Sequence, residues 1–447
     1  MQLNKVISAA MEQRIPELVL KNAKLVNVFS GEIYITDIAL DNGYIVGMGT
    51  YSGEKEVNLS DCYVSPGLID GHIHLESSMV TPGEFAKVVL PRGTTSVITD
   101  PHEIANVCGI EGINYIINCT EDIPLNVFIM APSCVPATKL DENGSVLDAG
   151  MVSELLERQQ VLGLAEMMNF PGVLNCNDDV LAKLTAARSK GKIIDGHAPG
   201  LSGKGLCSYV AAGIRSDHEC TSYDEALEKL RLGQWVMVRE GTAGKNMLDL
   251  LPLLTSDKSR RCMLVTDDKH PGDLIEEGHL DFMIRSLISR GVDPINAIQM
   301  ATINTAEYFG LKELGAVAPG YRADLVVLSD LTDFTVKDVY KDGKLVVQNG
   351  ELIPFTGKKT YLDIVKKSFH MPELKISDLV ISGTGSQMRA IGLVPGQIVT
   401  KELFFDLLSN NNGTFNSDIE RDLLKLVVVE RHKNTAHIGK AFVYGYG

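Results

Sequence analysis

The chain has 447 residues, of which 45% are hydrophobic and 22% are charged, a composition typical of folded globular proteins. This length exceeds what one ordinary hydrophobic core accommodates, so we expect two or three domains. The formal net charge of −15 argues against binding to nucleic acid or to an anionic membrane surface, because both favour a basic protein. The net charge does not argue for or against a small neutral substrate.

The N-terminal residues lack the continuous apolar core of a signal peptide, and no apolar run is long enough to span a bilayer. Eight cysteines are scattered without a Cys-x-x-Cys pair, which favours buried, reduced thiols over a disulfide framework or a zinc ribbon. We therefore expect a cytoplasmic protein.

Two β-rich pieces flank the rest of the chain. Residues 2–15 read as a short amphipathic helix, and brief β-rich runs broken by Asn-Gly and Ser-Gly turns follow from Glu17 to about Val64. The same texture returns at residues 323–328 and 339–347. The simplest architecture pairs the two pieces into one small β-sandwich, with the intervening residues inserted as a separate domain.

The inserted residues alternate short apolar runs with helical stretches, as buried parallel strands and their covering helices do. Eight strands are expected, at residues 63–73, 95–99, 126–131, 161–166, 192–196, 213–217, 235–239 and 263–266. Helices are expected between them at residues 153–160, 178–189 and 222–232, with the cluster at Asn177 capping the second. This rhythm predicts a (β/α)8 barrel, since an open doubly wound sheet usually has fewer strands and a glycine-rich phosphate turn.

The remaining chain, from about Ile376 to Gly447, reads as a unit of mixed α and β texture. Its end, Ala441–Gly447, reads as a strand entering a turn, so that either this strand closes a sheet edge or the domain is incomplete. The predicted domains are residues 1–64 and 313–372 for the two parts of the sandwich, 65–312 for the barrel and 373–447 for a C-terminal α+β domain.

Imidazole and carboxylate side chains follow many of the predicted strands, at the end of the barrel where active sites lie. They are His72, His74, His102, Glu166, His197, His218 and Asp267. Each position alone is a weak signal, because a single histidine at a strand end is more often solvated than bound to metal. Together, six of them exceed what one catalytic ion needs: His72, His74, Glu166, His197, His218 and Asp267. We therefore predict two divalent metal ions with Glu166 as a bridge.

The motifs around these residues are Pro66–Ser78, Thr99–Val107, Ala165–Val173, Asp195–Gly200, Ser216–Glu219 and Thr266–Asp268. They resemble the amidohydrolase superfamily, and more closely its adenine deaminase branch. Many relatives carry a carboxylated lysine on the fourth strand, whereas a glutamate there, as at Glu166, is a feature of this branch. The resemblance implies a metal-dependent barrel with a flanking β-sandwich and a C-terminal segment that continues past Gly447. We expect Mn²⁺ or Fe²⁺ as the ions, with Zn²⁺ as a further candidate, since the ligand set accepts all three.

The resemblance also implies a reaction. A metal-bridged hydroxide would attack C6 of adenine, and Asp267 would accept its proton and pass it toward the departing amine, leaving hypoxanthine and ammonia. Glu219, Glu103 and His102 are candidate acids for a ring nitrogen, and for His102 and Glu103 the alternative is hydrogen-bonded support of the metal ligands. Arg239 is a candidate purine contact, with an ion pair at the barrel end as its alternative.

Two other functions remain open at this stage. The first is another amidohydrolase that cuts a cyclic amide or amidine with the same metal centre, because one scaffold supports many substrates. The second is a non-catalytic scaffold that keeps the barrel for assembly. A homo-oligomer is expected in either case, and His270 and His279, which follow the last strand, are expected at the surface.

Overall fold

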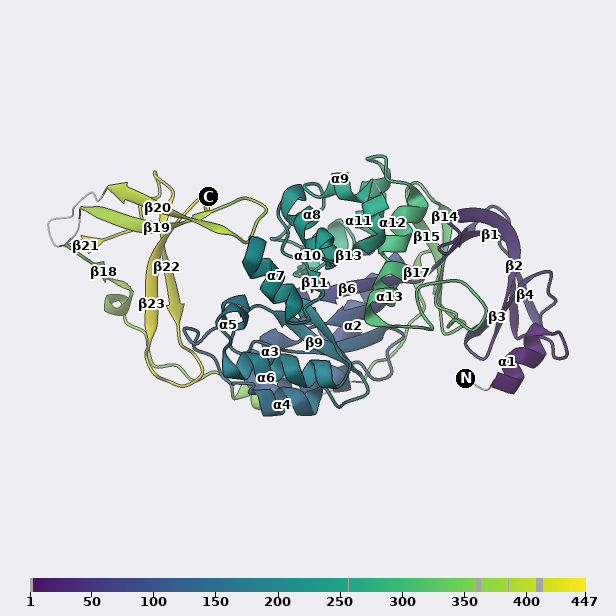
Figure 1. The fold of residues 1–447 in the computed structure, drawn as a ribbon, viewed down its shortest axis with the longest axis horizontal. Coiled ribbons are helices and arrows are strands. Elements are labelled where there is room, and N and C mark those ends of the chain that lie inside the picture. Colours follow the sequence, from purple (N-terminus) through teal and green to yellow (C-terminus); the bar gives the residue numbers. More distant parts are fainter. Residues whose placement is uncertain (1–2, 256, 359–362, 385, 407–412) are drawn as a thin grey trace.

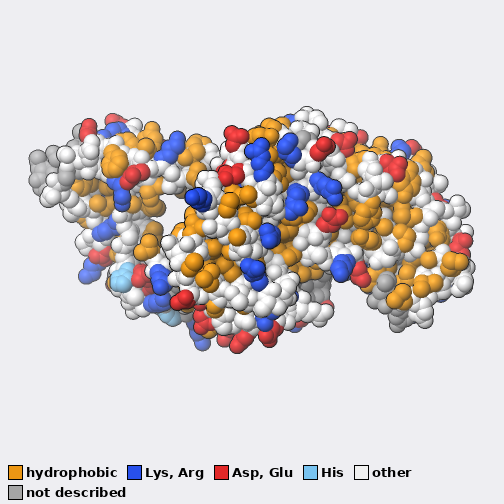
Figure 2. Space-filling view, in the orientation of Figure 1, with side chains coloured by type: hydrophobic (Ala, Val, Ile, Leu, Met, Phe, Trp, Pro, Cys, Tyr) orange, Lys and Arg blue, Asp and Glu red, His pale blue; other side chains and the backbone are white. Residues whose placement is uncertain are grey.

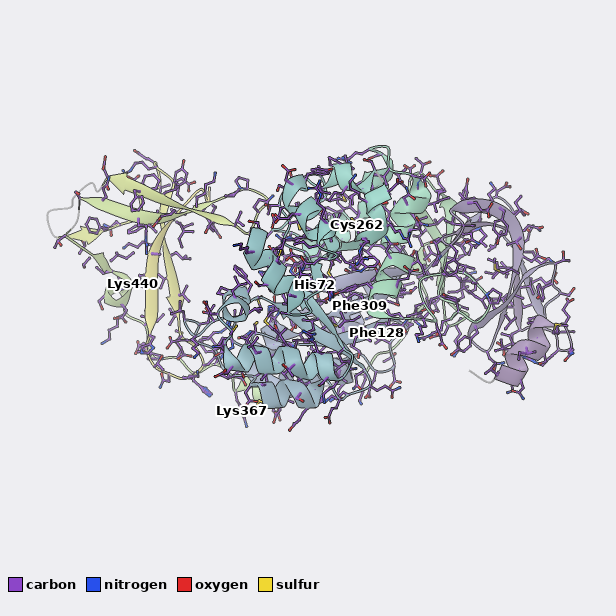
Figure 3. The ribbon with its side chains drawn as sticks, viewed as in Figure 1. His72, Phe128, Cys262, Phe309, Lys367 and Lys440 are labelled. Atoms are coloured by element: carbon purple, nitrogen blue, oxygen red, sulfur yellow. The ribbon has the colours of Figure 1, made fainter. Side chains whose placement is uncertain are left out.

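The computed structural model describes residues 3–255, 257–358, 363–384, 386–406 and 413–447. The barrel lies in the middle of an elongated molecule, the N-terminal sheet lies at one end, and a C-terminal β-rich unit lies at the other (Figure 1). His72 lies within the barrel, whereas Lys440 lies in the C-terminal unit (Figure 3). No helix among the described residues is both long and apolar enough to cross a membrane.

The two β-rich pieces of the sequence form one nine-stranded sheet in the order β17-β16-β15-β14-β5-β1-β2-β3, with β4 paired to β1. Antiparallel pairing of β14 with β5, Val326 opposite Ser65, joins the two pieces. The helix α1 (Leu3–Ala10) is shorter than the predicted 2–15. The strands are β1 Leu18–Asn27, β2 Glu32–Asp41, β3 Tyr44–Gly49, β4 Lys55–Asn58, β5 Tyr63–Pro66, β14 Leu325–Asp330, β15 Thr335–Lys341, β16 Lys344–Gln348 and β17 Glu351–Leu352.

The predicted strand 63–73 is two strands, which meet at Gly67. Residues before it belong to β5 of the sheet, and residues after it belong to the first barrel strand, β6 (Leu68–Ile73). Gly67 donates its amide to the carbonyl of Asp324 at 2.8 Å, and a Cβ atom there would lie 2.2 Å from Oγ1 of Thr95. Only glycine allows the chain to pass this closely between the two units.

The eight barrel strands form parallel sheets of five and three strands, in the orders β10-β9-β8-β7-β6 and β11-β12-β13. The amide of Arg215 donates to Ile194 at 3.1 Å across one seam, and a parallel bridge from Ile73 to Asp267 spans the other. The predicted α/β barrel is therefore confirmed. The strands after β6 are β7 Thr94–Thr99, β8 Asn126–Ala131, β9 Val161–Met167, β10 Ile193–Gly196, β11 Ser216–Asp217, β12 Trp235–Arg239 and β13 Cys262–Val265.

The helix predicted at 153–160 is wrong in its bounds, since α4 spans Ala149–Leu155. Its start is fixed by Asp148, whose carboxylate accepts the amide of Met151. Asn177 caps α6 as predicted. The other helices of the barrel region are α2 Pro82–Val89, α3 His102–Cys119, α5 Phe170–Leu174, α6 Asp178–Ser189, α7 Gly203–Ala211, α8 Tyr223–Arg231, α9 Leu251–Leu254, α10 Pro271–Glu276, α11 Leu280–Ile288, α12 Pro294–Met300 and α13 Ile303–Phe309.

Apolar side chains from the barrel strands pack together with α13 and fill the interior of the barrel. They include Ile69, Ile98, Met130, Met237 and Met263, each at most 1% exposed. This core closes the barrel below the C-terminal ends of the strands, which form the rim where active sites of such barrels lie.

The C-terminal unit contains a four-stranded sheet in the order β20-β19-β23-β22. Its loop at Gly396 accepts the amide of Lys245 at 3.1 Å and so contacts the barrel. The strand predicted at 441–447 is the end of β23. The elements are α14 Asp363–Lys366, β18 Ile381–Ser382, β19 Gln387–Leu393, β20 Thr400–Asp406, β21 Thr414–Phe415, β22 Leu423–Val429 and β23 Ile438–Tyr444.

Candidate metal centre

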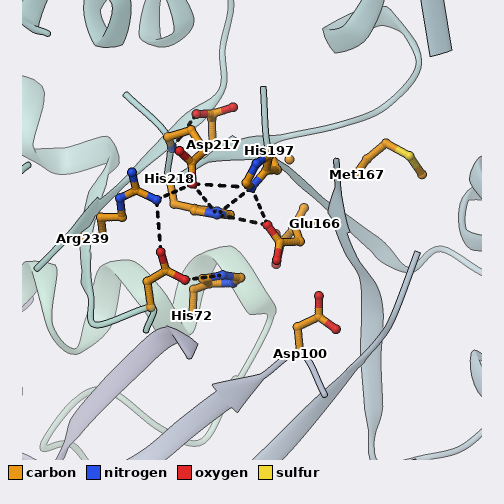
Figure 4. A network of polar contacts seen from close by, with 12 residues as sticks. His72, Asp100, Glu166, Met167, His197, Asp217, His218 and Arg239 are labelled. Atoms are coloured by element: carbon orange, nitrogen blue, oxygen red, sulfur yellow. Dashed lines mark hydrogen bonds and ion pairs between the residues drawn. The ribbon is translucent and has the colours of Figure 1, made fainter. Parts of the chain in front are cut away.

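All six predicted metal ligands converge at the rim of the barrel. Figure 4 labels His72, Glu166, His197 and His218 among them. They come from the ends of five different strands, far apart in the sequence. The fold brings them together because parallel strands of one barrel all end on the same side. His197 is partly exposed. The other five are almost fully buried: His72, His74, Glu166, His218 and Asp267.

Glu166 lies at the centre of the cluster. Its Oε2 atom lies 2.6 Å from Nδ1 of His197 and 3.1 Å from Nε2 of His218, while its Oε1 atom lies 3.4 Å from Nε2 of His74. On the other side, Oδ1 of Asp267 lies 3.2 Å from Nε2 of His74. The Glu166 carboxylate therefore contacts both groups of histidines, His72 and His74 of the first strand through His74, and His197 and His218 of the fifth and sixth strands. A bridging ligand must make such contacts on both sides.

The donor set fits divalent metal ions. Nε2 of His72 is buried and has no hydrogen-bond partner among the described residues. Nδ1 of His197 and Nε2 of His218 face each other at 3.2 Å, and both also face Glu166. Imidazole nitrogens and carboxylate oxygens that converge in this way match the ligands of zinc, iron and manganese.

The electrostatics of the cluster favour bound cations. Burial would raise the pKa of Glu166, but His197 and His218 hold that pKa well below its usual value. The pKa of Asp267 shifts in the same direction, since burial raises it and the neighbouring imidazoles of His72 and His74 lower it well below its usual value. Burial lowers the pKa of His218, yet the Glu166 carboxylate outweighs it and raises the pKa to about 9. The carboxylates thus remain anionic, and positive charge is stabilised between them.

Asp267 has an unusual backbone conformation that directs its side chain into the cluster. Its φ angle is +56°, in the left-handed region that costs energy for residues other than glycine. Its amide donates to the carbonyl of His72 at 2.9 Å, which fixes the last strand end against the first. Strain of this kind is typical of functional positions.

Arg239 is 1% exposed and does not open to solvent. Its Nη1 atom lies 3.1 Å from Oδ2 of Asp267 and also contacts Oε1 of Glu219. Its Nε atom donates to Asn246 at 3.0 Å, and Asn246 in turn donates to Oε1 of Gln397 at 2.8 Å. A chain of hydrogen bonds therefore connects the C-terminal unit to Asp267.

The other predicted acids lie on the opposite side of the cluster. Nδ1 of His102 lies 3.1 Å from Asp100 and 3.4 Å from Glu166. Burial lowers the pKa of His102, but the Asp100 carboxylate outweighs burial and raises the pKa to about 9. Glu103 accepts a hydrogen bond from Ser77 at 2.9 Å and does not contact the six ligands.

His279 was expected at the surface, and this expectation is wrong. It is 0% exposed, and its Nε2 atom lies 3.1 Å from Oδ2 of Asp70, while Nδ1 lies 2.9 Å from Oγ1 of Thr94. Asp70 also accepts the backbone amide of His72 at 3.2 Å. His279 thus supports the first strand end from behind, whereas His270 is exposed as expected.

A second buried pair, which sequence reasoning missed, supports the histidines of the fifth and sixth strands. Lys229 donates to Asp217 and to the carbonyl of Ala198, both at 2.9 Å, and its side chain is 0% exposed. Asp217 also accepts the amides of Ala198 and Glu219, each at 2.8 Å. These contacts fix the turns that follow His197 and His218.

The sequence matches the amidohydrolase family over residues 63–346 and the adenine deaminase C-terminal domain over residues 397–447. It is 46% identical over 445 residues to adenine deaminase 2 of Carboxydothermus hydrogenoformans, a match that covers 100% of this chain and 77% of the relative. It is 48% identical over 447 residues to the adenine deaminase of Desulfatibacillum aliphaticivorans, covering 99% and 78% of the two chains.

Solved structures of lower sequence identity have the same fold. The β-aspartyl dipeptidase of Fervidobacterium islandicum AW-1 superimposes with a TM-score of 0.58 at 16% identity, covering 76% of this chain and 99% of that one. A D-hydantoinase superimposes with a TM-score of 0.56 at 14% identity, covering 75% and 96%. At this identity the likeness supports the barrel and says nothing of the substrate.

Proposed function

Because the chain belongs to the amidohydrolase family and to its adenine deaminase branch, we propose that it hydrolyses adenine to hypoxanthine and ammonia. The observation that carries the proposal is the buried cluster around Glu166, in which one carboxylate contacts the histidines of both groups. Relatives that carry the name adenine deaminase match the chain over almost its entire length.

We propose that two divalent ions bind this cluster, Mn²⁺ or Fe²⁺ in preference to Zn²⁺. His72, His74 and Asp267 would hold one ion, His197 and His218 the other, and Glu166 would bridge them. Such ions supply a hydroxide nucleophile at neutral pH. The mixed imidazole and carboxylate donors support metal binding but are compatible with each of these three metals.

Asp267 holds the proton in this proposal. Its carboxylate is anionic in the folded protein and contacts both His74 and Arg239, so it can accept a proton and return it to the departing amine. Arg239 would orient this carboxylate through its contact at 3.1 Å. Its burial and its two ion pairs favour this positioning role over the predicted purine contact.

We assign protonation of the purine ring to His102. It is partly exposed at the rim, and the neighbouring carboxylates of Asp100 and Glu166 stabilise its protonated form. Glu219 is 1% exposed and pairs with Arg239, so its carboxyl group is less accessible to a purine ring than His102 is. Glu103 lies away from the cluster, beside Ser77, and its role there is support of the loop.

The test measures ammonia release and metal content on protein expressed with manganese and without iron. Asp267→Asn is expected to reduce turnover of adenine about a hundredfold or more, the range typical of a lost acid or base. Asp224→Asn, which makes the same charge change at an exposed position on α8, is the control and is expected to retain full activity. An Asp267→Asn protein with both metals and full turnover would exclude the role of Asp267.

The alternative substrates are cyclic amides and amidines, and a panel of lactams and hydantoins assayed beside adenine separates them. Protein that hydrolyses a member of this panel but releases no ammonia from adenine would contradict the proposal. A protein without stoichiometric metal and inactive on every purine would instead indicate a non-catalytic scaffold. A cytoplasmic location and a homo-oligomeric assembly stay predictions.

A further inference from the structure

The end of the barrel opposite the rim contains a basic pocket of about 480 Å³. It lies where β10, β12 and β13 begin, so the length of a strand separates it from the metal ligands at the other end. Its cationic side chains are Arg188, Lys192, Arg215 and Arg261, and its one carboxylate is Glu307. We call this the basic pocket.

Three of the four cations of the basic pocket are held by neutral groups. Nη2 of Arg261 donates to the carbonyl of Gly233 at 2.8 Å, and Nη1 of Arg188 donates to the carbonyl of Ala212 at 3.3 Å. Nζ of Lys192 donates to a backbone carbonyl as well. Backbone carbonyls orient these side chains without cancelling their charge.

Ion pairs to carboxylates, common elsewhere in the barrel, are absent here. Within the described part of the chain, none of the four cations forms a salt bridge, whereas Lys229 and Arg239 at the rim each pair with two carboxylates. In a protein of net charge −15, a cavity lined by four cations without a salt bridge and by one carboxylate is unexpected. Figure 2 shows Lys and Arg side chains gathered over the middle of the barrel on the face that it presents.

The wall of the pocket is aromatic. The guanidinium of Arg261 lies 5.0 Å from the ring centroid of Trp235, and the ring centroids of Trp235 and Tyr308 lie 5.7 Å apart. The contact with the Trp235 ring and the hydrogen bond to Gly233 together restrain the guanidinium of Arg261 at the wall of the pocket. Preoriented guanidinium groups bind phosphate oxygens through paired, charge-assisted hydrogen bonds.

We propose that the basic pocket binds a small phosphate-bearing molecule. The positive charge of the basic pocket selects an anion, and its guanidinium groups favour phosphate because phosphate oxygens accept several hydrogen bonds at once. A cavity of about 480 Å³ is larger than one phosphate group needs and has the size of a site for a phosphorylated metabolite. This site is separate from the deamination site and does not depend on that activity.

The floor of the basic pocket contacts the interior of the barrel. The hydroxyl of Tyr308 donates to Oδ1 of Asp195 at 2.6 Å, and Ser216 donates to the same oxygen at 2.8 Å. Asp195 is buried and lies two residues before His197. Because this contact lies close to His197, deamination kinetics are measured on the same samples as phosphate binding. The phosphate-binding result alone decides the proposal.

The test is calorimetric titration of the metal-loaded protein with inorganic phosphate, ribose 5-phosphate and ribose at low ionic strength. Neither phosphate probe contains a purine, and the Arg215→Gln variant described below separates binding in the basic pocket from coordination of phosphate by metal ions at the rim. We expect ribose 5-phosphate to bind, ribose not to bind, and affinity to fall as salt increases. Stronger binding of ribose 5-phosphate than of inorganic phosphate would identify a phosphate ester as the ligand, and equal binding would identify the free anion.

Arg215→Gln is the decisive variant, because Arg215 is exposed and its loss leaves the packing intact. Loss of one charge-assisted hydrogen bond is expected to weaken phosphate binding roughly ten- to a hundredfold. Arg231→Gln, the same change at an exposed position on α8 outside the pocket, is the matched control and should bind as the wild type does. Absence of phosphate binding at millimolar concentration, or equal affinity in both variants, would overturn the proposal.

Discussion

The two ends of the barrel treat charge in opposite ways. At the rim, cations and carboxylates are buried together and compensate one another, as Arg239 does with Glu219 and Asp267. At the other end, Arg215 and Arg261 border an open cavity and are oriented by backbone carbonyls or not paired at all. The same strands supply both ends, so the difference lies in the groups that accept hydrogen bonds from the cations, carboxylates at the rim and backbone carbonyls at the opposite end. Compensated charge builds a rigid site, and uncompensated charge leaves affinity for a ligand.

The largest effect is expected at the rim, from Glu166→Gln. The change removes the anionic bridge between the histidine groups, and His197 and His218 lose the carboxylate that faces both of them. We expect loss of bound metal and a decrease in adenine turnover of about a thousandfold or more. Metal analysis of the purified variant and its ammonia release measure both effects.

The control for this variant is Glu157→Gln, an exposed glutamate before β9 that pairs with Lys190. It should keep both metals and full activity, since surface ion pairs contribute little. Retention of two metals and of turnover in Glu166→Gln would show that the rim charges are not interdependent, and the contrast between the two ends would then fail.

Lys229→Met compares a compensated cation with the uncompensated Arg215. Lys229 is 0% exposed, and its removal leaves the carboxylate of Asp217 buried without its partner. Breaking a buried pair in this way costs about 3–5 kcal/mol of unfolding free energy. Arg215→Gln should change it by less than about 0.5 kcal/mol, as surface substitutions do. Urea unfolding of both variants measures the difference, and equal stabilities would refute it.

The pH dependence of this difference has a defined sign. Burial lowers the pKa of Lys229, but Asp217 outweighs it and raises the pKa above the usual 10.5. A raised lysine pKa gives stability that is complete below the unfolded value and is lost as pH rises through the folded value. The stability gap between wild type and Lys229→Met should therefore be constant from about pH 6 to 9 and shrink only above 10.5. Shrinkage within the neutral range would contradict this assignment.

The barrel and the convergence of the six predicted ligands were predictable because both rest on local patterns. Each strand is an apolar run, and a residue after such a run must lie at the rim, so His72, Glu166 and Asp267 could be assigned without knowledge of any contact. The division at Gly67 was not predictable in this way. Its cause is the approach of Thr95 from another strand, and no local pattern reports that.

The supporting residues were missed for the same physical reason. His279 follows a polar loop and reads as a surface residue, yet it is buried against Asp70, which lies more than two hundred residues earlier. Lys229 sits on an amphipathic helix where lysine is usually solvated, and only the fold brings Asp217 under it. Burial of a polar residue depends on its partner, so sequence periodicity alone cannot reveal it.

The smallest effect is expected where the C-terminal unit reaches the rim, in Gln397→Ala. Gln397 accepts from Asn246, which accepts from Arg239, so its loss loosens the orientation of the guanidinium that contacts Asp267. One neutral hydrogen bond corresponds to about a fivefold decrease in kcat. The KM for adenine should change less than kcat, because Gln397 positions a proton-accepting group and does not itself touch the substrate.

Gln387→Ala is the matched control, since Gln387 lies on β19 of the same unit and its side chain donates to Asp406 at 3.4 Å within that unit. If the C-terminal unit acts through Asn246 and Arg239, kcat falls in Gln397→Ala and not in Gln387→Ala. An equal decrease in both variants would mean that the mutations destabilise the unit as a whole. No decrease in either would mean that Arg239 is fixed by Glu219 and Asp267 alone, and that the compensated charge at the rim needs no support from outside the barrel.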